Sequence, residues 1–192
     1  MSTAVFTQVN QALKTLLDKA LTDVSGTPVV VFTPPGGDEP GDEVNQVSVW
    51  LYQVMVDEFS RNVPPAEAEG GDKRVRFRLP PLGVNLFYLI TPLQKNPESA
   101  QTALAFVLLA LHETPVLSVV EPNSEVNERV RVSFLPDSLD DRIKLWESLS
   151  KPYRLSVSYV ARTVRLASKQ TTTAAPVGST TVGFGDTQPL KR

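Results

Sequence analysis

The chain has 192 residues, a formal net charge of −2, one histidine and no cysteine. This length accommodates one domain, or one domain with an extension. The lack of cysteine excludes disulfides and thiolate metal sites, and a single histidine excludes a site with several histidine ligands. The slightly negative charge argues against nucleic acid as the main partner, because binding to a phosphate backbone requires a strong basic excess.

No segment of the sequence predicts insertion into a membrane. The N-terminal residues 1–4 lead into an amphipathic helix and lack the basic-then-apolar pattern of a signal peptide. No apolar run approaches the roughly 20 residues that a membrane span requires. We therefore expect no membrane partner and a cytoplasmic protein, unless it leaves the cell as part of a larger particle.

A long amphipathic helix is predicted at the start of the chain. Apolar residues recur at helical spacing over residues 3–24. Ser2 or Thr3 can cap the start of this helix, and Gly26 supplies a left-handed stop. A short strand, residues 29–32, follows.

The next loop, residues 34–43, is acidic, and its carboxylates are Asp38, Glu39, Asp42 and Glu43. Such a cluster suggests calcium, but its spacing lacks the alternating oxygen ligands and the final bidentate glutamate of calcium loops. We interpret the loop as a solvated turn and expect neither a metal nor a cofactor.

Residues 82–91 are the segment around which the rest of the chain is expected to pack. Nearly every side chain from Val84 to Ile90 is apolar, and prolines flank the run. A short run of this kind, rich in aromatic and branched residues, is typical of a strand buried on both faces. Residues 47–56 predict a second strand next to it.

An alternating arginine row follows an exposed excursion at residues 57–72. In residues 73–79, Val75, Phe77 and Leu79 alternate with Arg74, Arg76 and Arg78, so the apolar residues are expected to face inward and the arginines outward. The arginines can form a solvated strand face or a docking strip for an acidic neighbour. Arginine is favoured at interfaces, whereas three aligned like charges repel each other, so both interpretations stay open.

The second half of the chain predicts two more helices. Asn96 caps a helix over residues 97–112 whose nearly unbroken apolar character predicts burial on most sides. His112 is interpreted as a cation at the end of this helix and not as a catalyst. Asp137 or Ser138 caps a later helix whose apolar face carries Leu139, Ile143, Trp146 and Leu149.

Two strands and an extension complete the chain. Strands are predicted at residues 130–134 and 153–166, whereas residues 167–192 have no core-forming period. We therefore expect a globular domain at 1–166 and an extended C-terminal arm at 167–192. Threonine favours extended backbone, and the arm supplies three candidate interface residues, Thr172, Val182 and Phe184.

The sequence carries no catalytic motif. There is no Gly-x-Ser-x-Gly, no phosphate-binding glycine-rich loop followed by lysine, and no carboxylate pair in an evident acid–base setting. Catalytic residues that converge only in three dimensions would leave no such motif. We expect a protein that is not an enzyme.

Several blocks of the sequence resemble a known family. They comprise the helix at 3–24, Val49–Val54 followed by Arg61-Asn62, Leu79–Leu82 leading into Leu86–Pro92, Ala110–Leu117, and Leu145–Leu149 followed by Pro152–Tyr159. Together they resemble the tail-terminator or cap proteins of extracellular contractile injection systems, particles of the antifeeding-prophage and virulence-cassette type. The resemblance covers about residues 3–166. It is weakest at Val56-Asp57-Glu58-Phe59, where the family pattern is more polar.

The resemblance implies an α+β, tail-terminator-like fold, with a mixed or antiparallel central sheet packed by three helices and an extended C-terminal arm. It implies a structural protein in which six copies form a ring that ends the inner tube and contractile sheath. The implied partners are further copies of the chain and the tube and sheath proteins of the same particle. Arg74, Arg76 and Arg78 then become candidates for the contact between subunits.

Two other function classes stay open. A neck or tail-completion protein of a contractile phage would share these mechanics but would have a capsid partner. A soluble ligand-binding adaptor would have a pocket beside the buried strand and would stay monomeric. Neighbouring genes would separate the first alternative, and the molar mass in solution would separate the second.

Overall fold

The computed structural model describes residues 5–36, 45–60, 66–68, 75–78, 80–120, 127–166 and 171–174. Its elements in chain order are α1 (Val5–Ala20), η1 (Leu21–Asp23), β1 (Val29–Val31), β2 (Gln46–Val56), η2 (Glu58–Ser60), β3 (Ala66–Ala68), β4 (Val75–Arg78), β5 (Leu82–Pro92), α2 (Pro97–Glu113), β6 (Val116–Val120), β7 (Asn127–Phe134), α3 (Leu139–Ser148), β8 (Val157–Leu166) and β9 (Thr171–Ala174). The chain divides into two compact units, one of residues 1–63 and 81–167 and the other of residues 64–80 and 168–192.

The first unit is built on a six-stranded sheet with the strand order β1-β2-β5-β8-β7-β6. The β1–β2 pair is parallel and the other four pairs are antiparallel, so the sheet is mixed. With three α-helices among the described residues, the α+β prediction is confirmed. β5 pairs with β2 on one side and β8 on the other, which confirms the central strand expected from its apolar sequence.

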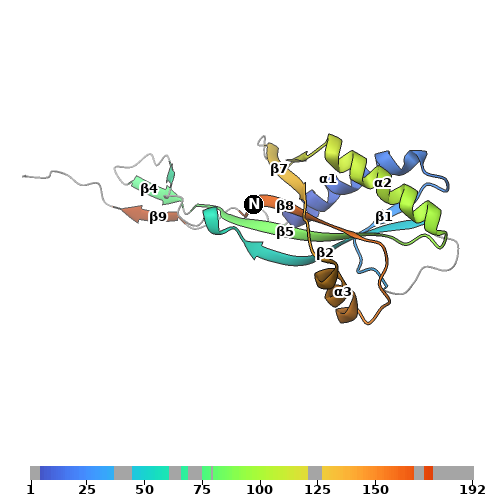
Figure 1. Ribbon diagram of the computed structural model, residues 1–192. Coiled ribbons are helices and arrows are strands. Elements are labelled where there is room, and N and C mark those ends of the chain that lie inside the picture. The colour runs from blue at the N-terminus through green and yellow to red at the C-terminus, as the bar shows by residue number, and fades with distance from the viewer. Residues whose placement is uncertain are drawn as a thin grey trace, which may run out of the picture. The chain divides into compact units, whose positions relative to one another are not determined.

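Helices cover both faces of this sheet. α1 and α2 lie on one face and α3 lies on the other (Figure 1). Alternate residues of β5, such as Leu86 and Tyr88, are buried in the same cluster as Val9 and Leu13 of α1. Because side chains alternate across a strand, Leu89 faces the side of the sheet that carries α3, and it is buried as well.

The local signals for helix ends are confirmed. The Asn96 side chain accepts a hydrogen bond from the Glu98 N–H at 2.9 Å, and Pro97 occupies the first turn of α2. Ser138 accepts from the Asp141 N–H at 3.1 Å and caps α3. Gly26 has a φ of +81°, as expected for the left-handed stop after the first helix. The proposed cap at Ser2 or Thr3 lies outside the described residues.

Several details of the strand and helix predictions were wrong. β8 begins at Val157 instead of residue 153, because residues 153–156 run beside α3, where Ser156 bonds to helix side chains instead of extending the ladder. α2 is buried on one side only, and its Leu109 is half-exposed. The sequence analysis did not predict the short strands β3 and β6.

The second unit contains a three-stranded sheet with the order β3-β4-β9. The arginine-containing strand β4 belongs to this sheet and not to the six-stranded one. It pairs antiparallel with β9, so that Phe77 lies opposite Thr172 and Arg76 opposite Thr173. The second unit therefore combines residues 64–80 with residues 168–192, which the sequence analysis had assigned to a separate C-terminal arm.

A buried tyrosine makes the stability of the first unit sensitive to alkaline pH. Tyr88 donates a hydrogen bond to Asn10 Oδ1 at 2.8 Å and joins β5 to α1. Burial raises the pKa of the Tyr88 hydroxyl well above its ordinary value. A raised folded-state pKa stabilises the fold fully below the unfolded pKa of about 10, and this contribution is lost as the pH rises further.

We therefore expect the free energy of unfolding to fall above about pH 10. Tyr88→Phe should make that fall less steep, while costing about 1 kcal/mol near neutral pH through the lost hydrogen bond. Urea unfolding between neutral pH and the alkaline range measures both effects, with the exposed Tyr153→Phe as the control. An equally steep fall in Tyr88→Phe and in the wild type would contradict this role of Tyr88.

Candidate functional site

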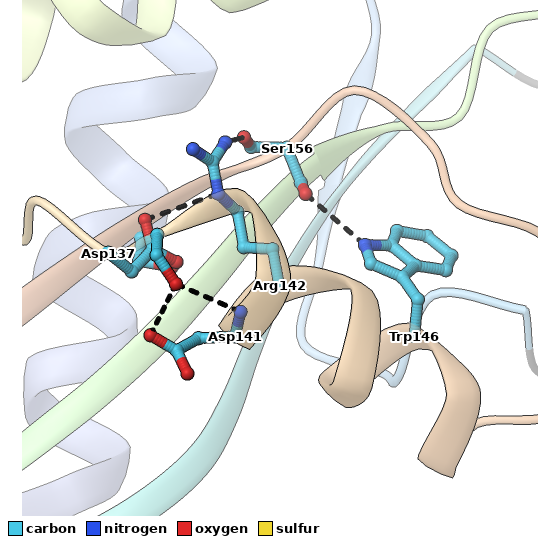
Figure 2. A network of polar contacts seen from close by, with 7 residues as sticks. Asp137, Asp141, Arg142, Trp146 and Ser156 are labelled. Carbon is cyan, nitrogen blue, oxygen red and sulfur yellow. Dashed lines mark hydrogen bonds and ion pairs between the residues drawn. The ribbon is translucent and has the colours of Figure 1, made fainter.

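A network of polar contacts fixes α3 to the segment that leads into β8 (Figure 2). Arg142 Nε lies 3.2 Å from Asp137 Oδ1, and Arg142 Nη1 donates to the Ser156 carbonyl at 2.9 Å. Ser158 Oγ donates to Asp137 Oδ2 at 2.7 Å. The buried Trp146 donates its indole N–H to Ser156 Oγ at 3.3 Å. The helix is thereby held by an ion pair, a capped start and a buried aromatic ring.

A shallow, open groove of about 450 Å³ lies beside this network, lined by Tyr52, Gln53, Asp137, Asp141, Lys144, Leu145 and Ser148. Burial, and secondly the charge of Asp137, raises the pKa of the Tyr52 hydroxyl, while a hydrogen bond with Ser158 acts in the opposite direction.

The polar groups of the network are used to hold α3 in place. Both carboxylate oxygens of Asp137 are engaged, one by Arg142 and one by Ser158. The one histidine of the chain, His112, is exposed in the last turn of α2. No group of three metal-ligating side chains occurs among the residues that the structure describes. Within those same residues, no helix is long and apolar enough to cross a membrane.

The structure brings part of the predicted interface set together in the second unit. Arg76 and Arg78 lie in β4, and Thr172 lies in β9, the strand hydrogen-bonded to β4. Arg74, Val182 and Phe184 lie outside the described residues. Arg76 and Arg78 of the arginine row are therefore neighbours of residues 171–174, at the beginning of the C-terminal arm, in one sheet. The sequence analysis had considered these two segments separately.

The sequence reading missed an exposed apolar patch at the end of β2, which we call the β2-end patch. It consists of Val54, Met55, Val56, Phe59 and Leu82. These residues surround the end of β2, where Val56 lies opposite Val84 of β5 and the Asp57 N–H bonds to the Gly83 carbonyl at 2.9 Å. Because side chains alternate along a strand, Val54 and Val56 lie on one face of the sheet and Met55 lies on the other. Phe59 in η2 is 97% exposed. Exposed apolar side chains that gather around the end of one strand are candidates for contact with another molecule.

A signal for this patch was present in the sequence. The stretch Val56–Phe59 is the place where the resemblance leads one to expect polar residues. The sequence predicted only that residues 47–56 form a strand next to the central one, and it did not predict that Val54, Met55 and Val56 are about half-exposed. Periodicity identifies the faces of a strand, but it does not say where the covering helices end.

Comparison with protein families identifies the relationship of this chain. The model of the Pvc16 N-terminal domain matches residues 8–180. The chain belongs to this family. Membership of the Pvc16 N-terminal domain family confirms the resemblance seen in the sequence. No curated protein matches the chain.

Two solved structures are similar to this Pvc16 N-terminal domain. The first is the sheath/tube terminator of an extracellular contractile injection system, PVC, in the extended state, with a TM-score of 0.65 and 25% identity over 100% of this chain and 67% of that one. The second is the tube-terminating cap of the anti-feeding prophage, with a TM-score of 0.67 and 23% identity over 92% of this chain and 60% of that one. At 23% identity, the second shows a shared fold. The chain thus spans 67% of the length of the first protein and 60% of the length of the second.

Proposed function

We propose that this protein is the tail terminator, or cap, of a phage-tail-like contractile injection system. In this role six copies form a ring that ends the inner tube and the contractile sheath. The observation that carries the proposal is the alignment of the entire chain with a sheath/tube terminator, at a TM-score of 0.65 and 25% identity. The role is structural, requires no catalysis or cofactor, and is exercised in the cytoplasm until the particle is released.

The surface features of the chain support an assembling protein over a soluble adaptor. A cyclic head-to-tail ring requires two different faces on each subunit, besides the faces that contact tube and sheath. The β2-end patch and the second unit, with its arginine-containing strand, offer such separate surfaces. The similar solved structures favour an injection system over the neck of a phage.

Electron microscopy of particles from a deletion strain tests the proposal. Without this protein, we expect tubes and sheaths of irregular length whose distal ends are uncapped. The wild-type gene should restore capped particles, whereas Phe59→Ser should restore fewer of them if the β2-end patch is a contact. Leu109→Ser, at a half-exposed apolar residue on α2, serves as the control. Capped particles of normal length in the deletion strain would refute the proposed function.

Charge reversal in β4 tests the proposed role of the arginine row in the ring. We expect Arg76→Glu to weaken the ring, because the row would then repel the acidic neighbour to which it docks. For the wild type, high salt should also weaken the ring, because salt screens such contacts. Size-exclusion chromatography with light scattering measures both effects, with exposed Lys19→Glu on α1 as the control. Rings of Arg76→Glu that match the wild type at every salt concentration would exclude the row from the interface.

We also propose that residues 167–192 act as an assembly arm on the sheath. An arm that joins the edge of a sheath sheet would gain affinity from backbone hydrogen bonds. Because β9 pairs with β4, truncation after Leu166 would also remove a strand of the second unit. Truncation after Ala174 keeps β9 and is the sharper test: rings should form but should fail to hold the end of the sheath. Normally capped particles with this truncation would contradict the arm.

A further inference from the structure

The two edges of the six-stranded sheet differ in whether side chains of the protein hydrogen-bond to their outer backbone groups. β1 forms one edge and β6 forms the other. An edge strand presents unpaired N–H and C=O groups that can pair with another chain unless the protein blocks them. The difference between the two edges therefore shows which of them is available for pairing.

The β1 edge is closed by charged side chains of α1. Lys14 Nζ donates to the Val30 carbonyl at 3.1 Å, and the Val30 N–H donates to Asp18 Oδ1 at 3.4 Å. Lys14 and Asp18 also form an ion pair with each other at 2.9 Å. Both backbone groups of the middle residue of β1 are thus occupied, and a further strand cannot add there without breaking this arrangement.

The β6 edge is open as far as the described residues are concerned. The Val132 N–H donates to the Pro115 carbonyl, so residues 115 and 132 form a hydrogen-bonded pair. Such pairs alternate along an antiparallel ladder, which makes Leu117–Val130 and Val119–Glu128 the next ones. The N–H and C=O groups of Val116 and Ser118 therefore point away from β7. Among the described residues, no hydrogen bond reaches these outward groups.

We propose that the open edge of β6 pairs with strand β9 of a second copy of this chain. The inference rests on the proposed ring and names the contact between its neighbouring subunits. It joins the first unit of one copy to the second unit of the next, so each copy uses two different edges. Head-to-tail contacts of this kind can close into a ring, whereas pairing of β6 with another β6 would stop at a dimer.

The choice of β9 follows from the strand edges that a second copy offers. The β1 edge of the second copy is closed, so the remaining candidate partners for β6 are β3 and β9, the two outer strands of the three-stranded sheet. β3 is Ala66-Glu67-Ala68, two residues with weak strand preference and one charge. β9 is Thr171–Ala174, in which three threonines favour extended backbone and no charge or proline opposes pairing.

A proline at Ser118 tests the use of this edge. Ser118→Pro removes an outward N–H that the chain itself does not use, and proline is tolerated at such positions of edge strands. Ser118→Ala keeps the N–H and is the matched control. We expect Ser118→Pro to raise the concentration at which half the chains are assembled by about tenfold or more, through the loss of at least one backbone hydrogen bond at each contact. Ser118→Ala should match the wild type.

Thiol cross-linking identifies the partner strand, and the lack of native cysteine removes any background. A chain with Ser118→Cys is mixed with a differently sized chain with Thr172→Cys, and a short bis-maleimide is added. We expect a cross-linked product that contains one chain of each kind, which can arise only between copies. Replacing Ser118→Cys by Val29→Cys, an exposed position on the closed β1 edge, should abolish the product.

Each result decides between the proposals. Rings of Ser118→Pro as stable as those of Ser118→Ala, or mixed chains without the cross-link, would overturn the pairing while leaving the cap function intact. If Ser118→Pro does not fold, as judged by circular dichroism, the cross-link alone decides. A wild-type chain that stays monomeric, together with normally capped particles in the deletion strain, would remove the ring itself.

Discussion

Trp146→Ala is expected to lower the free energy of unfolding by about 3–5 kcal/mol. Trp146 is only 2% exposed, and it is the one fully buried apolar residue of α3. Its removal opens a cavity between α3 and the sheet and leaves the Ser156 hydroxyl without the indole donor that lies 3.3 Å away. α3 should consequently loosen from its face of the sheet.

Leu139→Ala on the same helix is the matched control. The sequence places Leu139 and Trp146 on one apolar face, but Leu139 is 55% exposed. Its truncation should change the stability by less than about 0.5 kcal/mol. Urea unfolding followed by circular dichroism compares the two variants. Equal midpoints for Trp146→Ala and Leu139→Ala would show that α3 does not contribute to the core.

Leu86→Ala should cost about 2–5 kcal/mol. Leu86 is 0% exposed in β5, where it lies between Val54 of β2 and Ala161 of β8. Leu82→Ala makes the same chemical change in the same strand at a side chain that is 47% exposed, so it should cost clearly less. The difference between the two urea midpoints therefore measures burial alone. Similar urea midpoints for Leu86→Ala and Leu82→Ala would show that the centre of β5 is not part of the core.

Local sequence signals were sufficient for much of the fold. The sequence predicted the helix α1 from the spacing of its apolar residues and the strand β5 from its apolar run. It also predicted the helix caps at Asn96 and Ser138. Each of these features depends on residues within a few positions of one another. The family resemblance was likewise carried by short blocks, and the match over residues 8–180 confirms it.

The candidate site was less accessible to such reasoning. Asp137 and Ser138 were recognised as possible caps, but the ion pair between Asp137 and Arg142 depends on how α3 is placed against β8. Phe59 was visible as a departure from a polar pattern, yet only the structure showed that nothing in the described residues covers it. The pairing of β4 with β9 joins segments far apart in the chain, which no local pattern specifies.

The sequence by itself determined the types of the main elements, the central position of β5 and the family, since periodicity, capping and short motifs are properties of neighbouring residues. Only the tertiary structure decided which apolar faces are covered, as with Leu139 against Trp146, and which sheet receives β4. It also decided that Lys14 and Asp18 close the β1 edge, whereas no described residue bonds to the outward backbone groups of Val116 and Ser118 in β6. These outcomes depend on burial and on pairing between distant segments, and both are set by the packing of the whole chain.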